Sequence, residues 1–285
     1  MKDNIFKEPI LDIIKNRTSV RGFSDKEVST NTINDLVGYI SNMKSPYENN
    51  VRFEFLVEDS EIKKLGGKVG TYGVIKGAKN YIAIIGDKGK DTLYQIGYMG
   101  ESLVIYLTSL GLGSCWMGGT YDKGSFNKRL KLKDNEKLYI VIPFGYPLDK
   151  RSRVDYFMRF AARSNQRKSW EEIFFKGNYE QPLLEDEEQY LEALEGLRMS
   201  PSASNKQPWV VIKKGHYYDF YLKPTTGYGD ALGFKIQEID IGIAMFHFEA
   251  VLKDHGIKGK WEKTTNKNSS DEKLVYVTTW IEEGR

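Results

Sequence analysis

The feature that most constrains this chain is a segment that occurs twice. Gln95 to Trp116 (QIGYMGESLVIYLTSLGLGSCW) aligns without gaps on Asp240 to Trp261 (DIGIAMFHFEAVLKDHGIKGKW), 145 positions further on. An isoleucine–glycine pair near the start, one leucine, one glycine and the terminal tryptophan are identical in both copies. Self-similarity at a fixed offset is typical of a structural unit that is used twice. Any two amphipathic helices ending in glycine share part of this pattern, so the coinciding tryptophans carry most of the argument for a repeat.

Both copies predict a helix with one buried face. Apolar residues recur every three or four positions, which places them on one side of a helix with 3.6 residues per turn. Each pattern ends at a glycine, Gly111 or Gly256, where a left-handed C-terminal cap causes no Cβ clash. The apolar positions are Ile96, Met99, Leu103, Leu107 and Leu110 in the first copy and Ile241, Met245, Phe248 and Leu252 in the second.

The surrounding segments predict a similar small α+β unit in each half. Short apolar runs bounded by turn residues predict strands at 53–57, 81–85 and 138–144, and again at 209–212, 220–222 and 274–280. Further helices are predicted at 10–16, 30–42 and 190–198. We therefore predict an α+β fold with two similar halves, residues 1–150 and 151–285, packed as an intramolecular pseudo-dimer.

Charge, cysteine content and hydropathy exclude several classes of protein. The net charge of +3 argues against a nucleic-acid binder, although the basic stretch from 150 to 168 leaves that alternative open to a salt-dependent DNA-binding test. The single cysteine leaves no disulfide within the chain, and three histidines without acidic partners at ligand spacing predict no metal site. No apolar stretch approaches the roughly 20 residues that cross a bilayer, and the charged N-terminus is unlike a secretory signal. We therefore expect a soluble, cytoplasmic protein.

The loops of the two halves are unequal. The first half has a glycine-rich insertion from 61 to 79 between its first two strands, where the second half has only a turn at 213–216. The second half has an extra loop at 224–234 instead. Since loops carry most functional sites, unequal loops on similar scaffolds indicate that the halves have different roles.

Two polar segments are candidates for ligand contact. Arg17-Thr18-Ser19-Val20-Arg21 follows the first helix, and two guanidinium groups flanking a hydroxyl suit a phosphate. Solvated surface charges are the alternative interpretation of this segment. Ser200 to Trp209 (SPSASNKQPW) links a helix to a strand, and its prolines stiffen a loop whose small residues leave the backbone amides accessible. A capped connecting loop explains the same composition equally well.

Two glycine-containing turns complete the set of candidates. In Gly111 to Gly119 (GLGSCWMGG) the leading glycine caps a helix, and the trailing Gly118-Gly119 favours close approach of backbone to a flat ligand. The helix precedes this turn, so it is not a dinucleotide fingerprint, which needs a strand first. Gly145-Tyr146-Pro147 follows an apolar strand and leads to the basic residues at 150, 151 and 153, which suit either a phosphate or water.

Together these motifs resemble the nitroreductase family of FMN enzymes. The resemblance covers most of the chain, but its order is unusual. The family carries a PSxxNxQPW loop soon after the arginine–serine segment, whereas this chain has the degraded 45–50 (SPYENN) there and the intact copy at 200–209. The second half has only 163–167 (RSNQR) in place of an arginine–serine motif and no GYP. This pattern is similar to the branch in which two halves are fused in one polypeptide.

The resemblance implies one intact FMN site and one degraded site. Family members are homodimers whose two sites each take residues from both subunits, so the fused chain is expected to be a monomer with one FMN. The arginine–serine segment and a basic residue at 150 or 153 would hold the phosphate and ribityl chain. The backbone of 116–119 would face N5 of the flavin, residues 201–205 would cover it, and Thr71 is assigned by position alone. The implied cofactor residues are Arg17, Thr18, Ser19, Arg21, Thr71, Trp116, Met117, Gly118, Gly119, Lys150, Arg153, Pro201, Ser202, Ala203, Asn205 and Gln207.

The implied reaction is hydride transfer from NADH or NADPH through FMN to a small nitroaromatic, quinone or enone, with ping-pong kinetics. No side chain is predicted to act as catalytic acid or base, because the flavin carries the chemistry. Where the family often has an acidic residue beside the flavin, this chain has Met117-Gly118. A flavin carrier or regulatory protein without significant turnover is therefore the alternative prediction.

Overall fold

The computed structural model describes residues 5–57, 74–149, 160, 163, 166–264 and 273–284. The predicted cofactor residues Thr71, Lys150 and Arg153 lie outside these ranges. The chain divides into two compact units. We call residues 16–162 the N-terminal unit, and residues 1–15 together with 163–285 the C-terminal unit.

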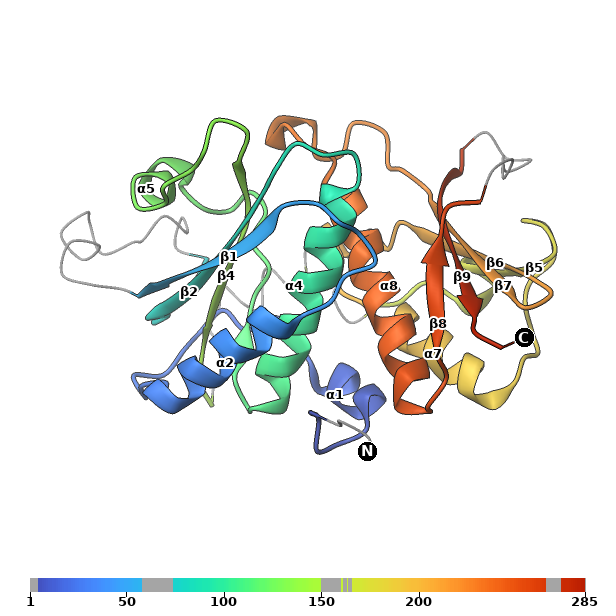
Figure 1. Cartoon of the computed structure of the whole chain (residues 1–285), viewed down its shortest axis with the longest axis horizontal. Coiled ribbons are helices and arrows are strands. Elements are labelled where there is room, and N and C mark those ends of the chain that lie inside the picture. Colours follow the sequence, from blue (N-terminus) through green and yellow to red (C-terminus); the bar gives the residue numbers. More distant parts are fainter. Residues whose placement is uncertain are drawn as a thin grey trace. The chain divides into compact units, whose positions relative to one another are not determined.

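The N-terminal unit contains a four-stranded sheet in which every pair of neighbours is antiparallel, in the order β1-β2-β4-β3. The long helix α4 lies along this sheet, and α2 crosses α4 (Figure 1). The strands are β1 (Val51–Val57), β2 (Asn80–Gly86), β3 (Gly113–Ser114) and β4 (Lys137–Gly145), and the helices are α2 (Thr30–Asn42), α4 (Thr92–Ser109) and α5 (Lys123–Asn127).

The C-terminal unit contains a five-stranded sheet in the order β5-β6-β7-β9-β8. Its pairs are antiparallel except β5 with β6, which is parallel. Helices α7 and α8 pack side by side in this unit (Figure 1). The strands are β5 (Phe174–Lys176), β6 (Trp209–Lys214), β7 (Tyr217–Leu222), β8 (Gly259–Glu262) and β9 (Val275–Glu282); the helices are α7 (Glu188–Arg198), α8 (Ile236–Asp254) and the short η1 (Trp170–Glu172), η2 (Ala203–Asn205) and η3 (Asp230–Leu232).

The first helix of the chain, α1 (Ile10–Asn16), packs with the C-terminal unit over residues 10–15. Its first backbone amide, at Ile10, donates to the carboxylate of Asp254 at 3.1 Å, and Ile10, Ile13 and Ile14 are buried. Its position in the sequence groups it with the first half, but Ile10 is hydrogen-bonded to a residue 244 positions away.

The two sheets share one strand order once β5 is set aside. The order β1-β2-β4-β3 in one unit corresponds to β6-β7-β9-β8 in the other, and all these pairs are antiparallel. In both units the long helix follows the second strand in the chain. The ladder between the second and fourth strands has a register shift in each unit, at Ile84/Ile85 and at Phe220/Tyr221.

The predicted α+β fold class is confirmed, and every predicted strand and helix is found. The prediction of one buried face for the two repeat helices is wrong. Every residue from 94 to 105 in α4 and from 239 to 252 in α8 is buried. The other faces carry apolar residues that suit an interior, such as Ile105 and Ala250, and buried polar residues such as Gln95 and Glu249, which are hydrogen-bonded. The short strands β3, β5 and β8 were not predicted.

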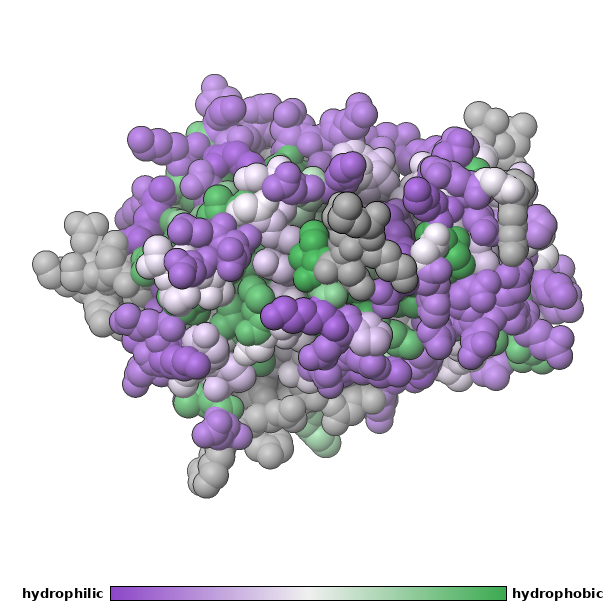
Figure 2. Space-filling view, turned by 60° about the horizontal axis from the view of Figure 1, so that its bottom comes forward, coloured by the Kyte–Doolittle hydropathy of each residue, from purple (hydrophilic) through white to green (hydrophobic). Residues whose placement is uncertain are grey.

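The cores are rich in aromatic side chains. In the C-terminal unit Phe248 meets Trp261 and Trp280 at ring-centroid distances of 6.3 Å and 5.7 Å, edge to face. On the face shown in Figure 2, hydrophilic residues predominate and hydrophobic residues appear in small separate patches. None of the described helices combines the length and apolar character that crossing a membrane requires.

Candidate functional site

The arginine segment, residues 17–21, is held between two neighbouring stretches of the N-terminal unit. The amide of Val20 donates to the carbonyl of Ser114 at 2.8 Å, beside a parallel bridge that joins Ser19 to Ser114. On its other side the carbonyl of Arg21 accepts from the amide of Lys76 at 2.9 Å. The arginine segment therefore runs next to β3, which begins the glycine-rich turn at 111–119.

The GYP turn, residues 145–148, lies against the continuation of the same segment. The amide of Ser24 donates to the carbonyl of Tyr146 at 2.9 Å, and the amide of Leu148 donates to the carbonyl of Gly22 at 3.0 Å. Three of the four motifs found in the sequence are thus neighbours in the N-terminal unit. Thr18 and Arg21 are partly exposed there.

Gly113 makes the close approach of the arginine segment possible. A Cβ on Gly113 would lie 2.6–2.9 Å from the side-chain carbons of Val20, which is closer than carbon atoms pack. Any larger residue would push the segment away from β3. The glycine at this position is therefore explained by packing, which sequence inspection did not reveal.

The turn after β3 has one paired amide, at Met117, beside residues whose amides have no acceptor among the described residues. Met117 is 1 % exposed and belongs to the core. Its amide and carbonyl both pair with Val141, at 3.1 Å and 3.0 Å, so neither is free for a ligand. Gly118 is half-buried and Gly119 exposed, and no described residue accepts from their amides. Of the stretch predicted to face a flavin, Trp116, Gly118 and Gly119 have backbone amides that no described residue accepts from, whereas the amide of Met117 is paired.

Sequence inspection missed a buried acid, Glu101, in the middle of α4. Its side chain is fully buried, and it accepts a hydrogen bond from the indole nitrogen of Trp116 at 2.8 Å. Arg17 Nε lies 3.8 Å from the second carboxylate oxygen, and the Arg17 side chain is only 8% exposed. The preceding Gly100 leaves room for the indole, since a Cβ there would lie 2.4 Å from the ring. Glu101 therefore fixes the tryptophan and balances the charge of Arg17.

The second tryptophan of the repeat is held in the same way in the C-terminal unit. The indole nitrogen of Trp261 donates to Glu249 of α8 at 2.7 Å. Glu249 also pairs with Lys253 at 2.6 Å, but the Lys253 side chain is 56% exposed. The two glutamates do not align in the ungapped repeat, where Glu101 falls on Phe246. Among the described residues, only the N-terminal copy of the repeat has a buried arginine beside the glutamate that binds its tryptophan.

The 200–207 loop, which contains the intact PSxxNxQ motif, has a strained backbone. Ser204, Asn205 and Gln207 adopt positive φ angles of 48°, 55° and 48°, a conformation that is uncommon for residues other than glycine. Inside the loop, the Gln207 amide donates to Ser202 Oγ at 2.8 Å. The Ala203 amide donates to Asp240 Oδ1 of α8 at 2.9 Å.

Two residues of this loop that were predicted to contact the cofactor have side chains that form hydrogen bonds within the C-terminal unit. Asn205 Nδ2 donates to the carbonyls of Gln166 and Arg163 at 2.8 Å and 2.9 Å. Gln207 Oε1 accepts from the amide of Lys168 at 2.8 Å. These side chains therefore hold Arg163, Gln166 and Lys168 and shape the loop. Pro201, Ser202 and Ala203 remain partly exposed.

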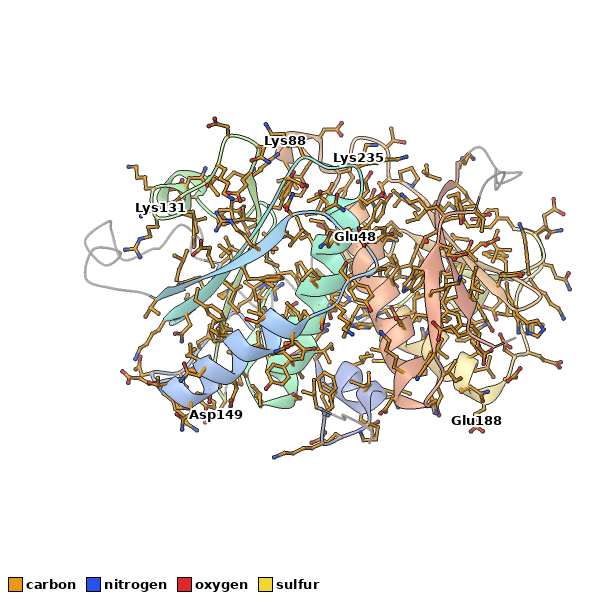
Figure 3. All side chains as sticks on the ribbon, viewed as in Figure 1. Glu48, Lys88, Lys131, Asp149, Glu188 and Lys235 are labelled. Carbon is orange, nitrogen blue, oxygen red and sulfur yellow. The ribbon has the colours of Figure 1, made fainter. Side chains whose placement is uncertain are left out.

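A cavity of about 510 Å³ lies beside this loop, in the part of the C-terminal unit that the first half lacks. It is formed by the 224–234 loop and the start of α8, which Lys235 marks in Figure 3. Tyr228 lines the cavity and its hydroxyl is 2.8 Å from Ser204 Oγ, so one side chain joins the cavity wall to the 200–207 loop. Among the described residues, no cluster of His, Cys, Asp and Glu side chains could hold a metal ion.

Comparison with known proteins identifies a family. The family described as "Putative TM nitroreductase" matches residues 9–251. A curated protein of Archaeoglobus fulgidus, named "Putative NADH dehydrogenase/NAD(P)H nitroreductase", is 26% identical over 176 residues, which cover 57% of this chain and 99% of that protein.

A solved structure shows the same fold. The crystal structure of a protein from Thermotoga maritima, described as a putative nitroreductase, has a TM-score of 0.60 at 19% identity and covers 99% of this chain and 98% of its own. A nitroreductase with bound FMN from Bacteroides fragilis has a TM-score of 0.40 at 20% identity, over 51% of this chain and 92% of its own.

Proposed function

This chain belongs to the TM nitroreductase family, and we propose that it is an NAD(P)H-dependent oxidoreductase with FMN as its cofactor. The observation that carries the proposal is the assembly of the arginine segment, the 111–119 turn and the GYP turn in the N-terminal unit. The name of the Archaeoglobus fulgidus relative supports a nicotinamide reductant. The chemistry that FMN supplies when bound is hydride transfer from NADH or NADPH to a small nitroaromatic, quinone or enone.

The residues present fit a phosphate-bearing, planar cofactor. Arg17 Nε is buried and has no hydrogen-bond partner among the described residues, so a ligand acceptor would satisfy it. Ser19 and Arg21 lie on the same segment, which is bridged to Ser114 of β3, and Gly118 and Gly119 follow β3 by a few residues. We propose that Arg17, Ser19 and Arg21 bind the phosphate and ribityl chain, with Lys150 or Arg153, and that Trp116 to Gly119 orient the ring. Thr18 and Thr71 complete this set.

We further propose that the chain carries one FMN and arose by duplication. The common strand order of the two sheets supports the duplication. The intact 200–207 loop of the C-terminal unit would contribute Pro201, Ser202 and Ala203, with Asn205 and Gln207 shaping it. The corresponding N-terminal loop has lost this motif. We also propose that the protein is a cytoplasmic monomer whose two units form an internal pseudo-dimer.

Flavin content and reduction test this function directly. The purified protein is expected to be yellow or to become so with added FMN, at about one flavin per chain, and anaerobic stopped-flow mixing with NADH or NADPH is expected to bleach it rapidly. A ratio near two would refute the single site. A protein that cannot be reconstituted with FMN would refute the function.

Arg21→Ala is expected to weaken FMN binding by about 10- to 100-fold, because a charge-assisted hydrogen bond to phosphate is lost. Fluorescence titration of flavin-free protein measures the change. Lys128→Ala is the matched control, since Lys128 is an exposed cation of the same unit outside the motifs. Equal affinities of the two variants would contradict the assignment of Arg21.

A flavin carrier without turnover is the second candidate. It is favoured by the buried Met117, which with Gly118 leaves the turn without an acidic side chain. Tightly bound flavin that neither NADH nor NADPH bleaches in the stopped-flow experiment would establish the carrier over the enzyme.

A further inference from the structure

A buried acid supports the 200–207 loop from α8. Asp240 is 2% exposed, and its Oδ1 accepts from the Ala203 amide at 2.9 Å. Its Oδ2 is buried and has no hydrogen-bond partner among the described residues. Buried polar atoms are nearly always paired, so an orphaned carboxylate oxygen requires a specific explanation.

The surroundings of Asp240 disfavour its charged form. No lysine or arginine in the described part of the chain pairs with it. The titratable group that faces it is Tyr228 of the 224–234 loop, and Lys206 lies beyond that ring, 5.5 Å from its centroid. Further along, Lys235 and Glu238 at the start of α8 pair with each other. Burial raises the pKa of Asp240 to about 8, against a smaller opposing effect of the Ala203 hydrogen bond.

The N-terminal unit supports its corresponding loop without an acid. Gln95 occupies the position that aligns with Asp240, 145 residues earlier. Its side-chain oxygen accepts from the Asn49 amide at 2.8 Å, and its nitrogen donates to the Asn49 carbonyl at 3.1 Å. A neutral amide thus ties the degraded loop at two points. An acid is not needed merely to hold a loop at this position.

The hydrogen bond of Asp240 acts at the start of the strained turn. Ala203 immediately precedes Ser204 and Asn205, whose φ angles are positive. Such residues persist only where the surrounding contacts fix them. Releasing the Ala203 amide would therefore allow the following residues to relax, and Pro201 to Ala203 would lose their fixed position.

We propose that Asp240 is a positioning residue that holds the 200–207 loop in its ligand-binding shape, and that ionisation of its unpartnered oxygen releases the loop. The neutral acid is tolerated in the buried position, whereas the carboxylate must be hydrated, which requires the loop to open. The identity of the ligand as FMN rests on the proposed function. The role of Asp240 in holding the loop is independent of that function.

Hydrogen–deuterium exchange of the flavin-free full-length protein tests the hold. After correction for intrinsic exchange, protection of 200–207 is expected to fall in the wild type between pH 7 and pH 9. It should stay level in Asp240→Asn, which keeps an acceptor but cannot ionise, and be lost at both pH values in Asp240→Leu. Gln95→Leu is the matched control and should release 45–50 while leaving 200–207 protected. Unchanged protection of 200–207 in Asp240→Leu, or a parallel pH response in Asp240→Asn, would overturn the proposal.

FMN titration of the same variants separates the two proposals. Asp240→Leu is expected to weaken FMN binding about 10- to 100-fold at pH 7, while Asp240→Asn and Gln95→Leu stay near the wild-type value. If the expected hydrogen–deuterium exchange pattern is observed but neither the wild type nor any variant binds FMN, the role of Asp240 is supported and the proposed cofactor is refuted. If FMN binds equally to the wild type and all variants, the positioning role of Asp240 is refuted and the cofactor is supported.

Discussion

Glu101→Ala is expected to lower the free energy of unfolding by about 3–5 kcal/mol, the usual cost of removing one partner of a buried charge pair. Arg17 would remain largely buried without its counter-charge, since its side chain is only 8% exposed. The Trp116 indole would lose the acceptor that now lies at 2.8 Å. Urea denaturation followed by circular dichroism measures the loss.

Glu249→Ala provides the matched control for this substitution. It also removes the acceptor of a repeat tryptophan, Trp261, but the cation it leaves unpaired is the exposed Lys253. We expect a smaller loss of about 1–3 kcal/mol, because the unsatisfied indole then accounts for most of it. Glu101→Gln should fall between the two, since an amide oxygen still accepts from Trp116. Equal losses for the two alanine variants would contradict the role assigned to Arg17.

The elements of the fold that could be predicted from sequence carry local signals. The helix at 30–42 begins after Ser29, whose side chain accepts from the Thr32 amide at 3.1 Å, and apolar spacing defines its length. The central strands β2 and β4 are nearly continuous apolar runs. The two long helices were visible because the repeat shows them twice.

The remaining elements depend on contacts that sequence does not encode locally. Strand β3 has only two residues, too few for any periodicity, and exists because β4 offers a free edge. Helix α1 packs through Ile10 on the end of α8 rather than on its own half. The all-round burial of α4 and α8 is a property of packing, because a buried glutamate or aspartate looks like a solvated residue in a sequence.

The candidate site shows the same division. Residue types and motif spacing pointed to the arginine segment and to the 200–207 loop. They did not reveal that the side chains of Asn205 and Gln207 are hydrogen-bonded to the backbone of Gln166 and Lys168. They also did not reveal Glu101 or Asp240, whose roles depend on the partners that the fold places beside them.

The protein is expected to lose stability as the pH rises from about 5 to about 8, and Asp240→Asn is expected to remove much of that loss. An aspartate in the unfolded chain has a pKa near 3.9, whereas burial raises the pKa of Asp240 in the folded protein to about 8. Between these values the folded state binds a proton that the unfolded state does not. The contribution is therefore fully present below about pH 4 and is lost as the pH rises through about 8.

Urea denaturation of both proteins at several pH values between 5 and 9 measures this contribution. Other groups titrate in both proteins, so the difference between wild type and Asp240→Asn isolates Asp240. That difference should change by a few kcal/mol across the interval, with the wild type losing more stability than the variant. Parallel curves would mean that Asp240 is ionised in the folded state near neutral pH. The orphaned oxygen would then be hydrated or paired in solution, and the 200–207 loop would be held by a charge rather than by a neutral acid.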